Sequence, residues 1–178
     1  GGFVAKENYY GYICVNGHSL KEIKSNNSNF AFITKVNLTE PVTNTRQYGE
    51  SIARIANVLG DGKPIIQSLK DLKDGRRSEW HRINKGFVIP TLKDCVAGDL
   101  ALVLPHRIIT NILEGLEKLD KIMPGINNDS TLFHKAWDEL RNKYKLSFKD
   151  DVMKDAYKNL IDSYLNVEET EETEKAEE

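Results

Sequence analysis

The chain has 178 residues, 39% of them hydrophobic, with 25 Lys and Arg against 27 Asp and Glu. A length of this order suits one ordinary globular domain with a real core, and the aromatic and aliphatic content excludes a chain that is disordered throughout. No apolar run approaches the roughly 18 to 20 residues that a membrane-spanning helix needs.

The formal net charge of -2 hides a difference between two parts of the chain. Residues 166–178 contain seven Glu and one Lys, a net charge of -6, so residues 1–165 carry a net charge of +4. We predict that the acidic tail at 166–178 is disordered. The folded part is therefore mildly basic, which by itself does not separate a polyanion-binding face from an average mixed surface.

The two cysteines, Cys14 and Cys95, form no CxxC pair. This count is too low for a disulfide scaffold or a structural zinc site, and it is typical of a protein in a reducing cytoplasm. The first residues lack a methionine and the features of a secretory signal, so we expect a fragment or a processed chain. No HExxH or EF-hand spacing occurs, and we predict no metal site.

The first 36 residues are predicted to form β structure. Runs of aromatic and β-branched residues at 10–15 and 29–36 are bounded by turn-forming Asn, Gly and Ser, and we expect these two strands to pair. The linker at 16–28 is long for a tight hairpin, and loops held by a rigid scaffold often carry binding residues.

Helical periodicity then replaces the β pattern. The apolar spacing predicts one helix through residues 52–59 that ends at Gly60, and a second, short helix from Pro64 to Gly75. A short apolar run at 87–89 is predicted to be a strand that the following proline stops.

The strongest helix signal runs from Pro105 to Met123, where the apolar residues fall on one broad face. Two further helices are predicted over about 132–145 and 150–165, each with one apolar stripe. We therefore predict an α+β fold, with a small β-sheet, several packed helices and a C-terminal helical extension. The expected boundaries are an α+β domain at 1–132, the helical extension at 133–165 and the acidic tail at 166–178.

The densest polar cluster is Gly-Arg-Arg-Ser-Glu-Trp-His-Arg at residues 75–82. Nearby lysines would extend it into a basic patch around Trp80. Arginine binds phosphate or carboxylate in a bidentate manner, and an indole can stack on a base or another flat ring. The alternative is a solvated connection whose Trp covers the core, because charge clusters are common on protein surfaces.

A second candidate site is the loop Asn-Gly-His-Ser at residues 16–19. Histidine can act as a general base or an electrophile near neutral pH, but a histidine beside a turn can also simply satisfy backbone groups. Neither Cys14 with His18 nor Cys95 with His106 makes a credible catalytic dyad, and Cys95 equally suits a small buried hydrophobe. The chain contains no GxGxxG, GxxxxGK[ST] or GxSxG motif.

Short pieces of the chain match one bacterial family in the family's own order. They include Cys-Val-Asn-Gly-His-Ser at 14–19, Tyr-Gly-Glu-Ser-Ile-Ala-Arg at 48–54, and the Gly-Arg-Arg-Ser that ends the piece at 72–78. The other pieces lie at residues 26–33, 38–41, 62–67, 90–92, 98–100, 104–108, 122–125 and 128–132. Together they resemble the bacterial NAD(P)/FAD-dependent oxidoreductases, a family of predicted FAD-dependent dehydrogenases.

The resemblance implies a two-part enzyme, in which an α+β domain is inserted into a Rossmann-like FAD domain, covers the flavin and shapes the substrate site. Residues 1–132 resemble that insert, so the resemblance implies FAD held mainly by the flavin-binding domain of the parent protein. It assigns no catalytic residue. The candidates that it suggests for facing the flavin or the substrate are Asn16, His18, Arg76, Arg77 and Ser78. After residue 132 the sequence departs from the family.

These observations lead to one expectation and two alternatives. We expect a substrate-side cap of an FAD-dependent oxidoreductase-like protein, inactive when alone. The first alternative is a stand-alone, non-enzymatic interaction module whose basic face around Arg76, Arg77 and Arg82 binds nucleic acid or an acidic partner. The second, a cysteine or histidine hydrolase, is disfavoured because no set of nucleophile, base and orienting group is visible.

Overall fold

The computed structural model describes residues 1–9 and 11–134. The chain divides into two units, Gly1–Leu140 and Arg141–Glu178, and every described residue belongs to the first. The helical extension and the acidic tail that the sequence predicts lie outside the described residues, apart from the start of the expected helix at 132–145.

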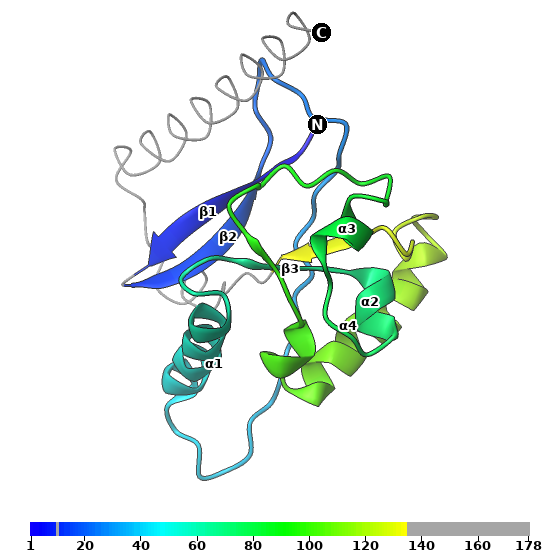
Figure 1. Cartoon of the computed structure of the whole chain (residues 1–178). Coiled ribbons are helices and arrows are strands. Elements are labelled where there is room, and N and C mark those ends of the chain that lie inside the picture. The colour runs from blue at the N-terminus through cyan, green and yellow to red at the C-terminus, as the bar shows by residue number, and fades with distance from the viewer. Residues whose placement is uncertain (10, 135–178) are drawn as a thin grey trace, which may run out of the picture. The chain divides into compact units, whose positions relative to one another are not determined.

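The chain begins with an antiparallel hairpin of β1 (Phe3–Tyr9) and β2 (Tyr12–His18) (Figure 1). The expected pairing of strands at 10–15 and 29–36 is therefore wrong, because β1 takes the place beside β2 and residues 29–36 form no strand. A short connection closes the hairpin at a lower entropy cost than a long linker. Gly11 in this connection has a φ of 87°, which glycine adopts without strain.

The central strand of a second sheet is β3 (Ile65–Ser68), with the strand order β4-β3-β5 (Figure 1). It runs parallel to β4 (Val96–Ala97) and antiparallel to β5 (Leu132–His134). All residues of β3, including the polar Gln67 and Ser68, are buried, and a strand covered on both faces lacks the alternation of apolar and polar residues that indicates a strand. The helix predicted from Pro64 is therefore wrong over this strand, and only its second half is helical.

Five helical elements lie between these strands along the chain. They are α1 (Thr45–Leu59), α2 (Leu69–Lys73), α3 (Trp80–Ile83), the short 3-10 helix η1 (Leu100–Leu102) and α4 (His106–Asp120). The two main helix predictions are confirmed by α1 and α4. The side chain of Asn44 caps α1, which ends at Gly60, and Pro105 precedes the first turn of α4.

Two further element predictions are wrong. Residues 87–89 form no strand, and Phe87 and Ile89 are 72% and 65% exposed. Residues 132–134 form β5 and do not begin a helix. The side chains of Leu132 and Phe133 pack against two different apolar clusters, so pairing with β3 decides their conformation over local helical spacing.

The two faces of β3 enter these two clusters. Ile66 packs on one side with Val15, Ile83, Leu92, Cys95 and Ala97. Ile65 packs on the other with Ala56, Leu72, Leu100, Val103 and Ile109. Because helices and strands alternate irregularly around this strand, the α+β prediction is confirmed. In the part of the chain that the structure describes, no helix has the length and apolarity to cross a membrane.

Candidate functional site

The candidate site is built where β3 ends and α2 begins. Ser68 is the last residue of β3 and the N-cap of α2, and its Oγ accepts a 3.2 Å hydrogen bond from the backbone N–H of Asp71. This cap fixes Asp71 in the first turn, where its side chain is only 2% exposed. A carboxylate placed there is favoured by the helix dipole but needs partners because it is buried.

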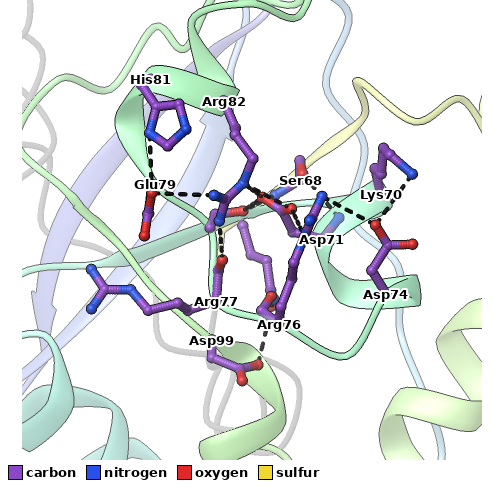
Figure 2. Close-up of polar contacts among 12 residues, drawn as sticks. Ser68, Lys70, Asp71, Asp74, Arg76, Arg77, Glu79, His81, Arg82 and Asp99 are labelled. Carbon is purple, nitrogen blue, oxygen red and sulfur yellow. Dashed lines mark hydrogen bonds and ion pairs between the residues drawn. The ribbon is translucent and has the colours of Figure 1, made fainter.

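Three side chains from the 75–82 segment supply those partners (Figure 2). Arg76 Nε donates to Asp71 Oδ1 over 2.7 Å, and Ser78 Oγ donates to Asp71 Oδ2 over 2.7 Å. Arg82 Nε lies 3.1 Å from Oδ1 and 3.2 Å from Oδ2. We call Asp71, Arg76, Ser78 and Arg82 the Asp71 cluster. These bonds fold the 75–82 segment back onto α2.

The electrostatics of the Asp71 cluster keep its carboxylate charged. Burial raises the pKa of Asp71, but the hydrogen bonds from Ser78, Arg76 and Arg82 outweigh burial and hold that pKa below its ordinary value. Both carboxylate oxygens already accept hydrogen bonds, so Asp71 is not placed to act as a general base. Its role is to position the groups around it.

The backbone of the same segment is fixed as firmly as its side chains. Ser78 is fully buried, its Oγ accepts from Ser68 N over 3.0 Å, and its own N–H donates to Gly98 O over 2.9 Å. The buried amide of Gln67 donates from Nε2 to Arg76 O over 2.8 Å, and its Oε1 accepts a bond from the backbone of η1. Residues 76–78 are therefore joined to β3 and to the loop after β4.

Arg77 differs from the other two arginines. Arg76 also bonds to Asp74, and Arg82 also bonds to Glu79, each at 3.1 Å. The carbonyl of Arg77 accepts a 2.6 Å bond from Arg82 Nη2, but among the described residues no hydrogen bond or ion pair reaches its guanidinium. Figure 2 shows this exposed side chain pointing away from the cluster. Among the described residues, Arg77 is therefore the arginine of the 75–82 segment whose guanidinium has no partner.

Asn16 and His18 lie on the hairpin and meet at Glu7. Asn16 Nδ2 donates to Glu7 Oε1 over 3.1 Å, and His18 Nε2 lies 3.5 Å from the same oxygen. Both residues belong to β2, so the expected loop at 16–19 is wrong over its first three residues. Their side chains share one face of the hairpin with Glu7, because Glu7 is paired with Cys14, two residues before Asn16.

The five sequence candidates thus fall into two groups. Arg76, Arg77 and Ser78 lie at the end of β3, and Asn16 and His18 lie on β2. Within the described part of the chain, no hydrogen bond or ion pair joins the hairpin group to the Asp71 cluster. The hypothesis that all five face a flavin or a substrate stays a prediction.

Comparison with known proteins decides the family. A family model described as FAD-dependent protein, C-terminal domain-like matches residues 1–136. The chain belongs to this family. The FAD-dependent part of the resemblance is therefore confirmed. No curated protein and no solved structure matches the chain.

In the described residues of this domain, the helices α1, α2 and α4 do not begin behind a Gly-rich turn of the kind that cradles the pyrophosphate of FAD. Such a cradle needs free backbone N–H groups at a helix N-terminus behind a Gly-rich turn. In α1 the side chain of Asn44 occupies one of these donors, and in α2 the first N–H groups donate to Thr131 O, Asp129 O and Ser68 Oγ. Pro105, not a Gly-rich turn, precedes α4. Over residues 1–9 and 11–134, no group of three or more His, Cys, Asp and Glu is arranged to hold a metal ion.

Sequence reasoning missed three residues that organise this C-terminal domain. Asp71 was detectable, because Ser68 and Asp71 form an S-x-x-D pattern typical of a helix start. Gln67 could have been found only if its strand had been recognised as buried. Glu7 had no local signal, since its link to Asn16 and His18 depends on the register of the hairpin.

Proposed function

We propose that the chain is the substrate-side cap domain of an FAD-dependent oxidoreductase, and that FAD is held mainly by residues outside it. The flavin supplies hydride or electron transfer, while this domain orients the substrate and excludes water. The family match supports the link to FAD. The described helix ends, which lack a pyrophosphate cradle, support placing most of the flavin contacts elsewhere.

The observation that carries the proposal is the free guanidinium of Arg77 on a fixed backbone. Arg77 contacts an anionic group of the substrate or of FAD, because a guanidinium binds carboxylate or phosphate through two parallel hydrogen bonds. Its backbone is already held by the Asp71 cluster and Gln67, so less conformational entropy is lost when a ligand binds. Arg76 and Ser78 act as positioning residues for Arg77.

Asn16 and His18 form a second polar site within this proposal. With Glu7 they place an amide and an imidazole on one face of the hairpin. Their side chains provide donors and acceptors for the flavin or the substrate, which is the role that the resemblance suggests for them. An amide and an imidazole offer donors and acceptors of the kind that ring carbonyls and ring nitrogens pair with.

Flavin titration tests where FAD is held. When the 178-residue chain is added to FAD, we expect no quenching of flavin fluorescence and no change in the melting temperature of the chain. Tight, stoichiometric binding of FAD by this chain alone would contradict the claim that most contacts lie elsewhere.

A matched pair of arginine variants tests the role of Arg77 in the complete flavoprotein. Arg54 on α1 is also exposed and, among the described residues, its guanidinium has no hydrogen bond or ion pair. We expect Arg77→Ala to raise KM for the substrate or Kd for FAD roughly 10- to 100-fold, and Arg54→Ala to change neither. The parameter that changes identifies the anion that Arg77 binds. Equal behaviour of the two variants would refute the assignment.

The alternative, a basic face that binds nucleic acid, is less well supported by the cluster geometry. Asp71, Asp74 and Glu79 neutralise much of the charge of Arg76 and Arg82, so few free cations remain to replace phosphate counterions. Filter binding of single-stranded and duplex probes at about 50 mM salt, which favours such contacts, tests this alternative. Retention of the probes that weakens steeply with salt would favour the nucleic-acid-binding alternative over the cap domain.

A further inference from the structure

The stretch from Phe30 to Leu38, which we call the 30–38 segment, has the composition of a strand but pairs with no strand in the described part of the chain. It is rich in aromatic and β-branched residues and contains neither Gly nor Pro. Its neighbour β2 is paired with β1 instead. Figure 1 shows the segment as a long trace without helix or strand, between the hairpin and α1.

The backbone of the 30–38 segment makes no hydrogen bond to any described residue. The flanking residues do make such bonds: Asn27 O accepts from Gly2 N, and Val42 N donates to Thr39 O. Among the described residues, the segment therefore presents a row of N–H and C=O groups without hydrogen-bond partners. A row of this kind is the template to which another strand adds.

One side of the 30–38 segment is nevertheless anchored. Burial alternates with a period of two, so that Phe32 and the residues at 34, 36 and 38 are half-buried and those between them are exposed. The ring of Phe32 lies against Gly115 of α4, where an added Cβ would collide with it. Thr34 Oγ1 on the same side is buried, and no described residue accepts or donates a hydrogen bond to it. The segment is thus held in strand-like alternation before any partner binds.

The free edge lacks the features that usually protect an exposed strand. Natural edge strands carry charges, prolines or bulges that block pairing, but the 30–38 segment has a single charged residue, Lys35. The exposed row includes Ile33, which is 71% exposed. A complementary strand would therefore place an apolar residue opposite Ile33 and an acidic residue beside Lys35, which is the next exposed position.

We propose that the 30–38 segment docks by strand addition onto an extended strand of the flavin-binding part of the same protein. That strand places an apolar side chain opposite Ile33 and an acidic side chain beside Lys35. This inference rests on the proposed function only for the identity of the partner. It gives the cap domain a defined, backbone-mediated contact with the flavin-binding part, remote in sequence from Arg77.

Hydrogen exchange followed by mass spectrometry tests the docking. In the 178-residue chain alone, we expect the amides of the 30–38 segment to exchange almost as fast as in an unfolded peptide. In the complete flavoprotein, we expect the same amides to exchange at least about 100-fold more slowly, because paired backbone groups open only with the structure that holds them. Rapid exchange of the segment in both samples would overturn the proposal.

Two pairs of variants in the complete flavoprotein show whether pairing itself causes the protection. Ile33→Pro removes a backbone donor and should abolish the protection, while Ile33→Thr keeps the donor and should retain it. Lys35→Glu should reduce the protection by placing like charges together, and Lys21→Glu is its control outside the segment. Circular dichroism confirms that each variant is folded, and Lys35→Glu still tests the docking if Ile33→Pro does not fold.

The remaining outcomes separate the docking from the proposed function. Protection that appears in the chain alone, rises with its concentration and accompanies a dimeric mass would assign the segment to a second copy and overturn the proposal. Protection in the complete flavoprotein together with unchanged kinetics of Arg77→Ala would support the docking and refute the role of Arg77. Absence of protection together with a strong effect of Arg77→Ala would refute the docking and support the role of Arg77.

Discussion

Ser78 Oγ donates to Asp71 Oδ2 over 2.7 Å while the same oxygen of Ser78 accepts the backbone N–H of Ser68 over 3.0 Å. One buried hydroxyl thereby connects the end of β3, the first turn of α2 and the 75–82 segment. The density of arginines in that segment suggests a binding patch, but two of the three arginines serve the buried carboxylate. The structure therefore separates residues that hold the segment from the one, Arg77, that it presents.

Removing the Asp71 carboxylate should destabilise the domain strongly. Asp71→Ala leaves Ser78 and two guanidinium groups without their shared acceptor, and we expect the free energy of unfolding to fall by about 3 kcal/mol. Asp74→Ala is the matched control, because its carboxylate is 37% exposed and its surface pairs should contribute under about 1 kcal/mol. Urea denaturation measures both values. A loss for Asp71→Ala as small as that for Asp74→Ala would show that the cluster is not structural.

The same carboxylate should make the domain sensitive to acid. The folded pKa of Asp71 lies below its ordinary value of 3.8, so the unfolded chain binds the proton first as the pH falls. Asp71 contributes fully to stability at pH values well above 3.8, the ordinary pKa of the carboxyl group. This contribution is lost as the pH falls through the lower pKa of the folded state. Urea denaturation from about pH 5 down to about pH 2.5 should show this loss. Asp71→Asn should flatten the slope below about pH 4, and an unchanged slope would contradict the assignment.

His134 on β5 should produce a second loss of stability at a higher pH. Burial lowers the pKa of His134 to about 4 from 6.5, and its Nδ1 is buried without a hydrogen-bond partner among the described residues. The unfolded chain is protonated below pH 6.5 while the folded chain is not, so stability falls by roughly 3 kcal/mol between pH 6.5 and about pH 4.

The control for this second loss is an exposed histidine. His134→Phe should remove the dependence between pH 6.5 and about pH 4, whereas His81→Phe, at a side chain 59% exposed, should leave it unchanged. Thermal melts in buffers across this range measure the effect. A wild-type melting temperature that is constant across the same range would show that folding does not lower the pKa of His134.

The two cysteines should be unreactive while the domain is folded. Both are buried, and neither is in a disulfide. Cys95 Sγ donates to Leu92 O over 3.1 Å, and burial raises the pKa of this thiol to about 11, so little thiolate exists at about pH 8. Labelling with a thiol-specific chromogenic disulfide should be slow in the native chain and complete in guanidinium. Fast labelling of the native chain would contradict the burial of Cys95 in the core.

Local patterns in the sequence were sufficient for the elements whose conformation depends on nearby residues. The stripe that ends at Gly60 and the stripe after Pro105 predicted α1 and α4, because helical hydrogen bonds and caps are local. The α+β class followed from the same patterns. The family resemblance, carried by ordered short motifs, agreed with the FAD-dependent family that matches residues 1–136.

Pairing between distant residues was decided only in three dimensions. The sequence could not show that 29–36 would lose its place beside β2 to β1, nor that 132–134 would join β3, because strand pairing depends on which edge is available. It also could not show that Asp71, Asp74 and Glu79 would pair with Arg76 and Arg82, while no described residue pairs with the guanidinium of Arg77. Sequence determined which residues carry charge, and the tertiary structure decided which of those charges are already used, since burial makes an unpaired charge costly.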